Sequence, residues 1–574
     1  MNSMNLKNPG KGLAVGNRQF DLTILVWVAI ALTLAFLTVN PVVKLFADSF
    51  RSTVDQSFTV ANYVKAFTSS AKLSAIWTTT VYATGTAFLA LVFALPTAWA
   101  VTRTDMPFKG LVRALVLASF ILPSYLGAVA WLLLAGPNSG WINVAWRQLT
   151  GLESSILNVY SFPGLIFVTA LYSYAFIFVF ASDAFERLSS ELEDAANILG
   201  AGPVRTTFKI TLPLVAPAII GGMIVTFLET FTLFGTPAII ALPARINVMT
   251  LELWSYFQYP VDTNGAAAYA LPLIGITCLL FLLQRLYFGR KSYVTVTGKT
   301  AERRLIPLGG YKWAFLGYSF GISMLALGFP LIALTQAAFT KAWGRSFSID
   351  NFTFENFRYV LFQNNDTFDA IVNTALYGSA AATLAVILSL AVAYIVARKL
   401  LPFGGVLGFL CMAPFVIPGI VIAIGFYSAY ANAPFYLYGT GLIIIIAFTT
   451  RFLPIAYMNS TAGVKSLNPE MEDAVRILGG GRMRALRSVV IPLLKGSIAG
   501  SWMLVFIPAI RELSSALFIV TPNTKVMSIL ILDYSEGAQF EMLSAIGLIT
   551  LIASVAVYLV SRLLVGRDVM LRKQ

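Results

Sequence analysis

The sequence predicts an all-α polytopic membrane protein, with about twelve transmembrane helices arranged as two tandem, parallel repeats of six. Three observations point to this class. Hydrophobic residues make up 58% of the 574 residues and charged residues only 11%, with a mean hydropathy of +0.78. Apolar runs long enough to cross a hydrocarbon core of about 30 Å recur along the chain. A polar stretch occurs twice, at residues 191–213 and 470–492.

Each half of the sequence contains six apolar runs. They lie near residues 22–46, 75–101, 111–135, 163–185, 211–239 and 267–287, and again near 313–339, 371–396, 404–430, 439–459, 491–520 and 542–564. An even number of spans gives both halves the same orientation, related by a pseudo-two-fold axis along the membrane normal. The predicted domains are a first repeat at 1–288, a basic cytoplasmic linker at 289–311 and a second repeat at 312–574.

The basic residues predict the orientation. They gather before the first run, between the second and third runs, between the halves and at the C-terminus: Lys7, Lys11, Arg18, Arg103, Lys109, Arg113, Arg285, Arg290, Lys291, Lys299, Arg303, Arg304, Arg562, Arg567, Arg572 and Lys573. Counted over the predicted spans, all lie on one side, which the positive-inside rule assigns to the cytoplasm. We therefore expect both termini in the cytoplasm. The distribution of the net charge of +14 indicates contact with lipid rather than with nucleic acid. No small-residue cleavage site follows the first run, so we expect no cleaved signal peptide.

The duplicated stretch has the pattern of a short helix that ends at a glycine. Glu191 aligns with Glu470 and Pro213 with Pro492, an offset of 279 residues without a gap. Ser190 with Glu193 predicts a capping box, and Asn468 before Pro469 predicts an N-cap. Apolar residues then recur at helical spacing, at Leu192, Ala195, Ala196 and Leu199, and at Met471, Ala474, Val475 and Leu478. Gly200 and Gly479 follow where a helix C-cap needs positive φ, so the chain should turn there.

The pattern Asp194-Ala195-Ala196, three residues, Gly200, nine residues and Ile210-Thr211-Leu212-Pro213 resembles the coupling motif of binding-protein-dependent ABC importer permeases. That family has Glu-Ala-Ala, Gly and Ile-x-Leu-Pro. The second copy has Asp473-Ala474-Val475, Gly479 and Val489-Val490-Ile491-Pro492, and both copies have Asp in place of the usual Glu. A pair of interfacial amphipathic helices is the alternative, but two copies at matched spacing favour the coupling motif.

The resemblance implies a type I ABC importer permease fold in the bacterial inner membrane. It also implies that two copies of a cytoplasmic ABC ATPase dock on the duplicated stretches and that a periplasmic solute-binding protein delivers cargo. The coupling residues would be Glu193, Asp194, Ala195, Ala196, Gly200, Arg205 and Pro213, with Glu472, Asp473, Ala474, Gly479, Arg484 and Pro492 in the second copy. We expect the carboxylates to pair with basic groups of the ATPase and the small alanines to allow its close approach.

The composition argues against chemistry within the chain. There is no histidine, and the two cysteines, Cys278 and Cys411, lie in apolar runs without the spacing of a disulfide or metal site. Gly298-Lys299-Thr300 resembles the end of a P-loop, but Tyr293 stands where that loop needs glycine. We expect a transport subunit rather than an enzyme, without a metal or cofactor of its own, and with ATP and Mg²⁺ on the partner ATPase subunits.

Four charged residues lie within apolar runs, where each costs about 2.5–3.5 kcal/mol on insertion scales. They are Glu229, Arg451, Arg511 and Glu512. They either neutralise one another or line the pathway between the halves. The span after the coupling motif lines that pathway in the family that the chain resembles. Gly235-Thr236-Pro237 and Ser514-Ser515 would then be breaks or close-packing points along it.

The repeat extends beyond the coupling stretches. Arg103, Pro107, Phe108, Gly110 and Pro123 match Arg398, Pro402, Phe403, Gly405 and Pro418 at an offset of 295. The first half therefore carries 16 extra residues before the coupling stretch, the difference between the offsets of 295 and 279. We place much of this excess in the outward loop at residues 136–151. That loop is a plug, a docking surface for a binding protein, or plain variation in loop length.

The predicted mechanism is alternating access driven by closure of the ATPase dimer. The fusion of both halves in one chain, Glu512-Leu513 and the FGTPAIIALPA run resemble the ferric-iron permease group, so ferric iron is the expected cargo. Phosphonate, sugar phosphate, thiamine, polyamine and sulfate importers are related alternatives. An ion-gradient-driven secondary transporter has no need for two coupling stretches, and a membrane-embedded enzyme needs a clustered acid–base or metal set.

Overall fold

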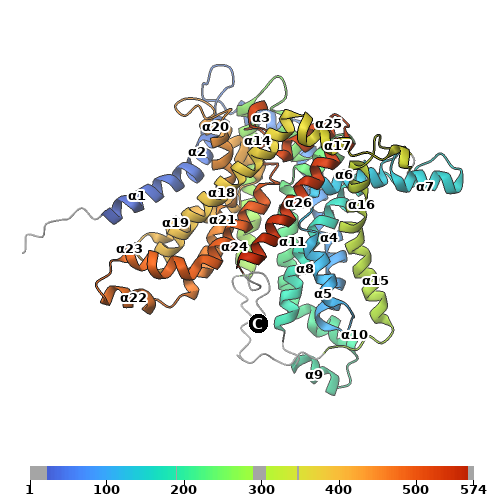
Figure 1. Cartoon of the computed structure of the whole chain (residues 1–574), viewed down its shortest axis with the longest axis horizontal. Helices are drawn as coiled ribbons and strands as arrows, with labels where there is room; N and C mark the ends of the chain where they lie inside the picture. The colour runs from blue at the N-terminus through green and yellow to red at the C-terminus, as the bar shows by residue number, and fades with distance from the viewer. Residues whose placement is uncertain (1–21, 189–190, 289–304, 346–347, 566–574) are drawn as a thin grey trace, which may run out of the picture.

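The computed structural model describes residues 22–188, 191–288, 305–345 and 348–565. Within these ranges the chain is helical, with three isolated β-bridges and no β-strand. The predicted capping residue Ser190, most of the linker at 289–311 and both terminal segments lie outside the described residues. Figure 1 shows two helical bundles side by side, joined by helices between them.

The described part of the first half contains fourteen α-helices. They are α1 (Leu22–Leu34), α2 (Asn40–Ser49), α3 (Ala61–Thr68), α4 (Ser70–Arg103), α5 (Lys109–Ala118), α6 (Ser124–Ala135), α7 (Trp141–Thr150), α8 (Phe162–Arg187), α9 (Glu191–Ile198), α10 (Pro203–Thr206), α11 (Leu212–Thr232), α12 (Gly235–Ile240), α13 (Met249–Ser255) and α14 (Thr263–Phe288). One π-helical turn joins α1 to α2, and a second joins α10 to α11.

The second half repeats this order. Its helices are α15 (Tyr311–Ser323), α16 (Phe329–Ala338), α17 (Glu355–Arg358), α18 (Asn365–Ala397), α19 (Gly404–Met412), α20 (Gly419–Tyr430), α21 (Gly441–Ser466), α22 (Glu470–Ile477), α23 (Arg482–Ala485), α24 (Ile491–Ala509), α25 (Met527–Glu536) and α26 (Phe540–Val565). A π-helical turn again joins α15 to α16, and another joins α23 to α24, at the positions that match those of the first half.

The predicted all-α fold with two parallel repeats is confirmed, and the span count differs in one respect. The described residues contain ten helices long and apolar enough to cross a membrane, or eleven when α19 and α20 count as one bent span. The sequence predicts twelve because an apolar run does not reveal a bend. Its third run in each half is broken, by 112° between α19 and α20 and by the segment between α5 and α6 in the first half. Pro123 and Pro418 each stand at the N-cap of the second piece.

Small side chains hold the core helices of each half close together. Ala83, Ala90, Ala94 and Ala98 are fully buried on one face of α4, which packs along α8. The corresponding pair is α18 and α21, where the hydroxyls of Ser389 and Ser460 lie 3.1 Å apart. In a membrane such small-residue faces let helix backbones approach closely, and packing then supplies the association. Helices α11 and α24 complete the two cores.

The first span of each half packs on the core of the opposite half. Helix α2 contacts α20, and α16 contacts α6, although α2 and α16 also contact the last span of their own repeats, α14 and α26. The Tyr430 hydroxyl of α20 donates to the Phe36 carbonyl, and the Tyr318 hydroxyl of α15 donates to the Val92 carbonyl of α4 at 2.6 Å. The two bundles of Figure 1 therefore each combine both repeats.

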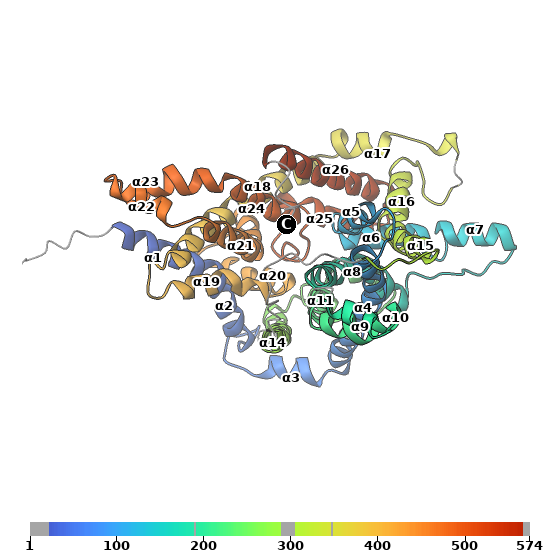
Figure 2. The ribbon, with the colours of Figure 1, turned by 90° about the horizontal axis from the view of Figure 1, so that it is seen from below.

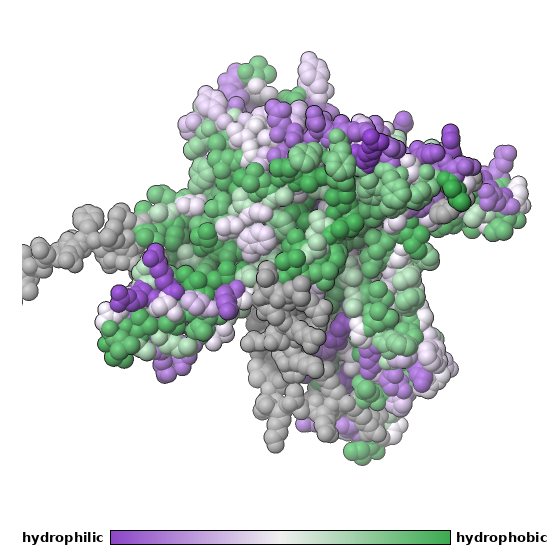
Figure 3. All heavy atoms as spheres, in the orientation of Figure 1, coloured by the Kyte–Doolittle hydropathy of each residue, from purple (hydrophilic) through white to green (hydrophobic). Residues whose placement is uncertain are grey.

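The surface follows the expected membrane pattern. In Figure 3 apolar side chains cover the middle of the molecule, and hydrophilic side chains gather along the upper rim. Helices α3, α7 and α17 lie at this upper side, whereas α9 and α22 lie at the lower side (Figure 1). The two halves therefore present their duplicated stretches on the same side of the membrane region, as predicted.

Candidate functional site

The two duplicated stretches form matching elbows on the lower side of the molecule. We call residues 191–213 the first elbow and residues 470–492 the second. In each, a short helix ends at a glycine, and φ is +81° at Gly200 and +82° at Gly479. The predicted left-handed glycines are therefore confirmed. After Gly202 and Gly481 the chain re-enters a helix that continues through a π-helical turn into α11 or α24. Viewed from below, the elbows lie on different sides of the molecule (Figure 2).

In the first elbow, Glu193 points into the protein. Its carboxylate pairs with the guanidinium of Arg103 at the end of α4, and the Arg103 side chain is only 1% exposed. The Thr211 hydroxyl donates to the same carboxylate at 2.6 Å. Arg103 also donates to the Leu188 carbonyl at 3.4 Å, at the end of α8. One buried ion pair thus connects the elbow to the ends of two core helices.

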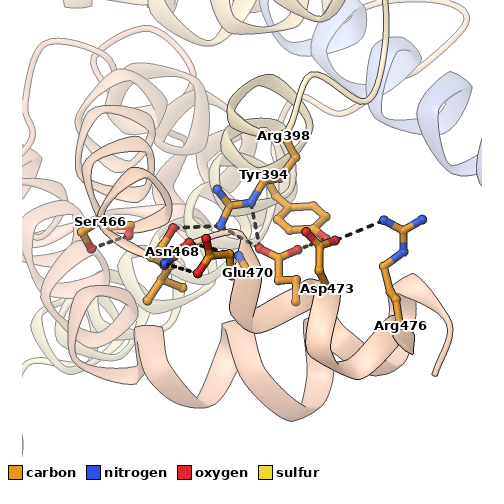
Figure 4. A network of polar contacts seen from close by, with 10 residues as sticks. Tyr394, Arg398, Ser466, Asn468, Glu470, Asp473 and Arg476 are labelled. Carbon is orange, nitrogen blue, oxygen red and sulfur yellow. Dashed lines mark hydrogen bonds and ion pairs between the residues drawn. The ribbon is translucent and has the colours of Figure 1, made fainter. Parts of the chain in front are cut away.

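The second elbow repeats this arrangement. Arg398 donates to Glu472 at 2.7 Å, the Tyr394 hydroxyl donates to Glu472 at 2.7 Å, and Arg398 also donates to the Leu467 carbonyl at 3.2 Å. Figure 4 shows Tyr394 and Arg398 reaching down to the helix that carries Glu470 and Asp473. Asn468 accepts from the Glu470 N–H at 3.1 Å, the capping contact expected at this helix start, while the helix itself begins one residue later than predicted.

These contacts differ from the sequence-based expectation. Glu193 and Glu472 were expected to face basic groups of a partner, but they are 6% and 8% exposed and pair with arginines of this chain. From the sequence, Arg103 and Arg398 are identified only as equivalent positions of the two repeats, and no contact is predicted for them. The repeat alignment was the signal that could have identified them, since it pairs both the two arginines and the two carboxylates.

The remaining predicted elbow residues divide between the inner and outer sides. Ala196 is buried, whereas Ala195, Ala474 and Asp473 are exposed, and Asp473 pairs with Arg476 at 3.4 Å. Asp194 is half-buried. Arg205 and Arg484 are exposed within the elbows, and Pro213 and Pro492 lie in the first turns of α11 and α24, where proline costs no helical hydrogen bond.

The outer side of each elbow is apolar. Ile198 and Leu199 are 86% and 87% exposed, and Ile477 and Leu478 are 85% and 86% exposed. Figure 3 shows hydrophobic spheres at the lower ends of the molecule where α9 and α22 lie. A soluble or lipid-facing helix would turn its apolar residues inward or into the membrane. Here the carboxylate faces the protein and the apolar residues face away, which is the pattern of a surface that a partner covers.

The intramembrane charges gather where the broken segments of both halves meet. We call Tyr125, Glu229, Arg451, Arg511 and Glu512 the central cluster. Arg511 interacts electrostatically with Tyr125, Glu229 and Glu512, and Glu229 also interacts with Arg451. These residues come from α6, α11, α21 and the segment that follows α24.

Each arginine of the central cluster binds carbonyls at a helix break. Arg511 donates to the Phe120 carbonyl and, at 3.1 Å, to the Ile121 carbonyl in the break between α5 and α6. Arg451 donates to the Ile417 carbonyl at 3.1 Å in the break between α19 and α20. Carbonyls at a broken helix lack their intrahelical partners, and a membrane offers no water to replace them. Because Arg511 belongs to the second half, it ties the first-half break to the second half.

The predicted close-packing points lie beside this cluster. A Cβ on Gly235 would stand 2.9 Å from Tyr125 and 3.2 Å from Leu513. A Cβ on Gly419, at the start of α20, would stand 3.1 Å from Ser514 and 3.2 Å from the Glu512 carboxylate. Helices α11 and α24 end at Thr232 and Ala509, so the chain breaks at both places where the sequence suggested it, and the helices are shorter than the predicted runs.

Comparison with known proteins places these features in a family. The family of the binding-protein-dependent transport system inner membrane component matches the chain twice, at residues 87–293 and 389–567. The chain belongs to this family. Its two matches correspond to the two repeats, so this permease carries two copies of the family's domain in one polypeptide. The description of the family is that of an inner membrane component of a transport system.

Individual relatives of the permease include three of note. A ferric transport system permease protein of Actinobacillus pleuropneumoniae is 27% identical over 71% of this chain, and the match spans 59% of that protein. A putative ferric transport system permease protein of Haemophilus influenzae is 26% identical over 87% of this chain and 78% of its own length. A molybdate/tungstate transport system permease protein of Thermococcus kodakarensis is 26% identical over 47% of this chain and 98% of its own length.

Among solved structures, a bacterial ABC transporter that imports the acidic polysaccharide alginate aligns with a TM-score of 0.39 and 15% identity. The alignment covers 47% of this chain and 96% of that one.

Proposed function

We propose that this permease is the transmembrane subunit of an ATP-driven importer that passes ferric iron from a periplasmic binding protein to the cytoplasm. Two copies of a cytoplasmic ABC ATPase dock on the two elbows, and ATP with Mg²⁺ binds on those subunits. Both termini and both elbows lie in the cytoplasm. The two ferric permease relatives support the cargo, and the duplicated elbow supports the ATP-driven mechanism.

One observation carries the mechanism. In each elbow a buried Arg–Glu pair fixes the short helix to the core, and two apolar residues on the opposite side stay 85–87% exposed. The buried ion pair transmits a displacement of the elbow directly to the core helices, α4 and α8 in the first half or α18 and α21 in the second. The exposed apolar residues provide the surface that an ATPase subunit covers. Closure of the ATPase dimer then moves the two bundles relative to each other and turns the pathway from inward-facing to outward-facing.

The test is uptake of radiolabelled ferric iron into proteoliposomes. They contain this chain with its ATPase, and iron-loaded binding protein is present on the outer-facing side. We expect ATP-dependent uptake that disappears with an ATPase subunit unable to hydrolyse ATP and persists in the presence of an uncoupler. Uptake that continues with the inactive ATPase but collapses with the uncoupler would replace this proposal by an ion-driven transporter.

A further inference from the structure

The connection between α6 and α8 is longer than its counterpart in the second half, and it contains an additional helix. It comprises residues 136–161, whereas the connection between α20 and α21 comprises residues 431–440, none of which is helical. The difference is 16 residues, which is the whole excess indicated by the two repeat offsets. Helix α7 lies within the longer connection. All of the extra length of the first half is therefore associated with this one element.

Helix α7 is fixed by a buried hydrogen-bond network. Asn143 is fully buried, and its side-chain amide donates to the carbonyls of Gly136 at 2.9 Å and Leu157 at 2.8 Å. Its side-chain oxygen accepts from the Leu157 N–H at 3.0 Å, and Arg147 donates to the Pro137 carbonyl at 3.0 Å. The helix is thus tied to the segments before and after it. Plain variation in loop length does not account for a side chain that is buried and hydrogen-bonded in this way.

The base of α7 adjoins a membrane span of the second half. Trp141 stacks on Trp343, which follows α16, with ring centroids 5.9 Å apart and ring planes at 24°. The Trp343 N–H donates to the Glu541 carboxylate at the start of α26. Helix α16 belongs to the span at residues 311–338, and its Phe329 and Ile332 side chains are exposed. In a spanning helix such exposed apolar side chains face lipid, so α7 begins beside a lipid-facing surface.

From this base, α7 projects away from both bundles. It extends beyond α15 and α16 at the edge of the molecule in Figure 1 and again in Figure 2. Figure 1 also shows that its axis runs across the direction of the spanning helices, on the side opposite the elbows. A plug would have to lie between the two bundles. The position of α7 is instead that of an element at the periphery of the molecule.

The side chains that α7 leaves uncovered are apolar. Ile142, Ala145 and Leu149 are exposed, and their spacing of three and four residues places them on one face of the helix. Asn143 and Arg147 are four residues apart and lie on a different face, which carries the hydrogen bonds to the neighbouring segments. A helix that is fixed by its polar face and presents an apolar face beside a lipid-facing surface has the properties of an interfacial helix.

We propose that α7 lies on the surface of the membrane opposite the elbows, with Ile142, Ala145 and Leu149 among the headgroups and upper acyl chains of the phospholipids. The continuity of its base with the exposed surface of α16 favours lipid as the occupant. Its direction favours the same occupant, because a protein that delivers cargo has to sit above the bundles, and α7 points away from both. Through Asn143 and Trp343, the helix then fixes the depth of both halves on this side of the membrane.

This inference goes beyond the proposed function and needs no transport for its test. A nitroxide spin label is attached at Ile142→Cys or Leu149→Cys of the full chain, after Cys278→Ser and Cys411→Ser have removed both native thiols. Each phospholipid nanodisc holds one copy, so contact between copies cannot protect the label. The measurement is the collision rate of the label with oxygen, which partitions into lipid, and with a water-soluble nickel chelate. We expect both labels to lose collisions with the nickel chelate and to gain collisions with oxygen.

Three reference positions calibrate the measurement. Ile332→Cys on α16 supplies the lipid-facing reference, and Val54→Cys supplies the aqueous one, since Val54 is 95% exposed in the loop between α2 and α3. Gln148→Cys is the matched control within α7, because this exposed polar residue lies about 100° around the helix from its neighbour Leu149. We expect Leu149→Cys to resemble Ile332→Cys, and Gln148→Cys to collide more often with the nickel chelate than Leu149→Cys does.

The outcomes separate lipid from the other possible occupants. Collision with the nickel chelate at Ile142→Cys and Leu149→Cys as frequent as at Val54→Cys overturns the proposal. Protection that appears only when loaded binding protein is added also overturns it, and would assign α7 to that protein. All substitutions except those of Cys411 and Ile332 are at sites outside the packed core, and thermal unfolding of each variant shows that it is folded. Absence of iron uptake leaves this inference unaffected, because neither the probe nor the readout involves cargo.

Discussion

Arg398 and Glu472 form an ion pair at 2.7 Å, and Arg103 forms the same pair with Glu193 in the other half. Both pairs join the end of a long core helix to the short helix of an elbow. The Tyr394 hydroxyl adds a further hydrogen bond in the second half and the Thr211 hydroxyl one in the first. These are the contacts through which a force on either elbow reaches the membrane-spanning core.

Removing one member of such a pair leaves the other charge buried and unpaired. We expect Glu472→Ala to destabilise the second elbow by about 3–5 kcal/mol and to abolish stimulation of ATP hydrolysis by the loaded binding protein. The double variant Arg398→Ala/Glu472→Ala should be less destabilised than the sum of the single variants, as measured by thermal unfolding in a double-mutant cycle. Arg476→Ala is the control, since the Arg476–Asp473 pair is more than half exposed and should be worth little. Additive single effects would contradict the anchoring role.

The elbows need glycine at residues 200 and 479 because of the backbone conformation there, not because a side chain would clash with its neighbours. A Cβ at Gly200 or Gly479 would meet nothing within 4 Å, but both residues have φ near +80°. We expect Gly200→Val/Gly479→Val to insert normally and to lose coupled transport, because a β-branched residue is strained at positive φ. Gly202→Val/Gly481→Val is a matched control, since these glycines also have open space but φ values of −69° and −72°. Normal uptake by the first pair would exclude the elbow as the coupling element.

The exposed apolar residues of the elbows should matter for ATPase binding and not for folding. We expect Ile477→Ser/Leu478→Ser to leave thermal unfolding of the isolated permease unchanged, because both side chains are already exposed. Co-purification of the ATPase should fall strongly, because the lost apolar area is the area that the partner covers. Leu149→Ser on α7 provides the comparison, since Leu149 is 85% exposed on the opposite side of the molecule. Equal ATPase recovery for both variants would count against the docking surface.

Arg511 should contribute to stability through the break that it caps. We expect Arg511→Ala to lower the free energy of unfolding by about 1–3 kcal/mol for each carbonyl left without a donor, those of Phe120 and Ile121. Arg187→Ala should change it by less than about 0.5 kcal/mol, because the Arg187–Asp183 pair lies on an exposed helix face. The measurement is thermal or denaturant unfolding in the same detergent. A small effect at Arg511 would mean that water reaches the break.

Local and repeated features were predictable from the sequence. The two repeats, the long apolar spans and the left-handed glycines each follow from patterns within one segment, such as the run before Gly200. The inward direction of Glu193 and Glu472 was not predictable in the same way, because their partners lie 90 and 74 residues away. The bends in the third span of each half were also missed. Hydropathy is the same for a straight and a broken helix, and only Pro123 and Pro418 marked the break.

The role of the central charges remained open for a related reason. Glu229 and Arg511 are separated by nearly half of the sequence, and the pattern alone gave each of them equal reason to be a counter-ion or a pathway residue. The contacts distinguish them, since the Arg511 guanidinium donates to the Phe120 and Ile121 carbonyls, whereas the Glu229 carboxylate makes no hydrogen bond within the described residues. That Glu229 lines a pathway stays a prediction.

The exchange of first spans determines which parts of the permease can move as units. Helix α2 belongs to the first repeat but packs on α20, and α16 belongs to the second repeat but packs on α6. A rigid body in this molecule is therefore the core of one repeat together with the opening helices of the other. The two sequence repeats therefore do not coincide with the two rigid bodies. Cutting the polypeptide between the repeats would leave two fragments that remain interlocked. A first span transplanted from a relative would have to match the core of the opposite repeat rather than the core of the repeat to which it belongs.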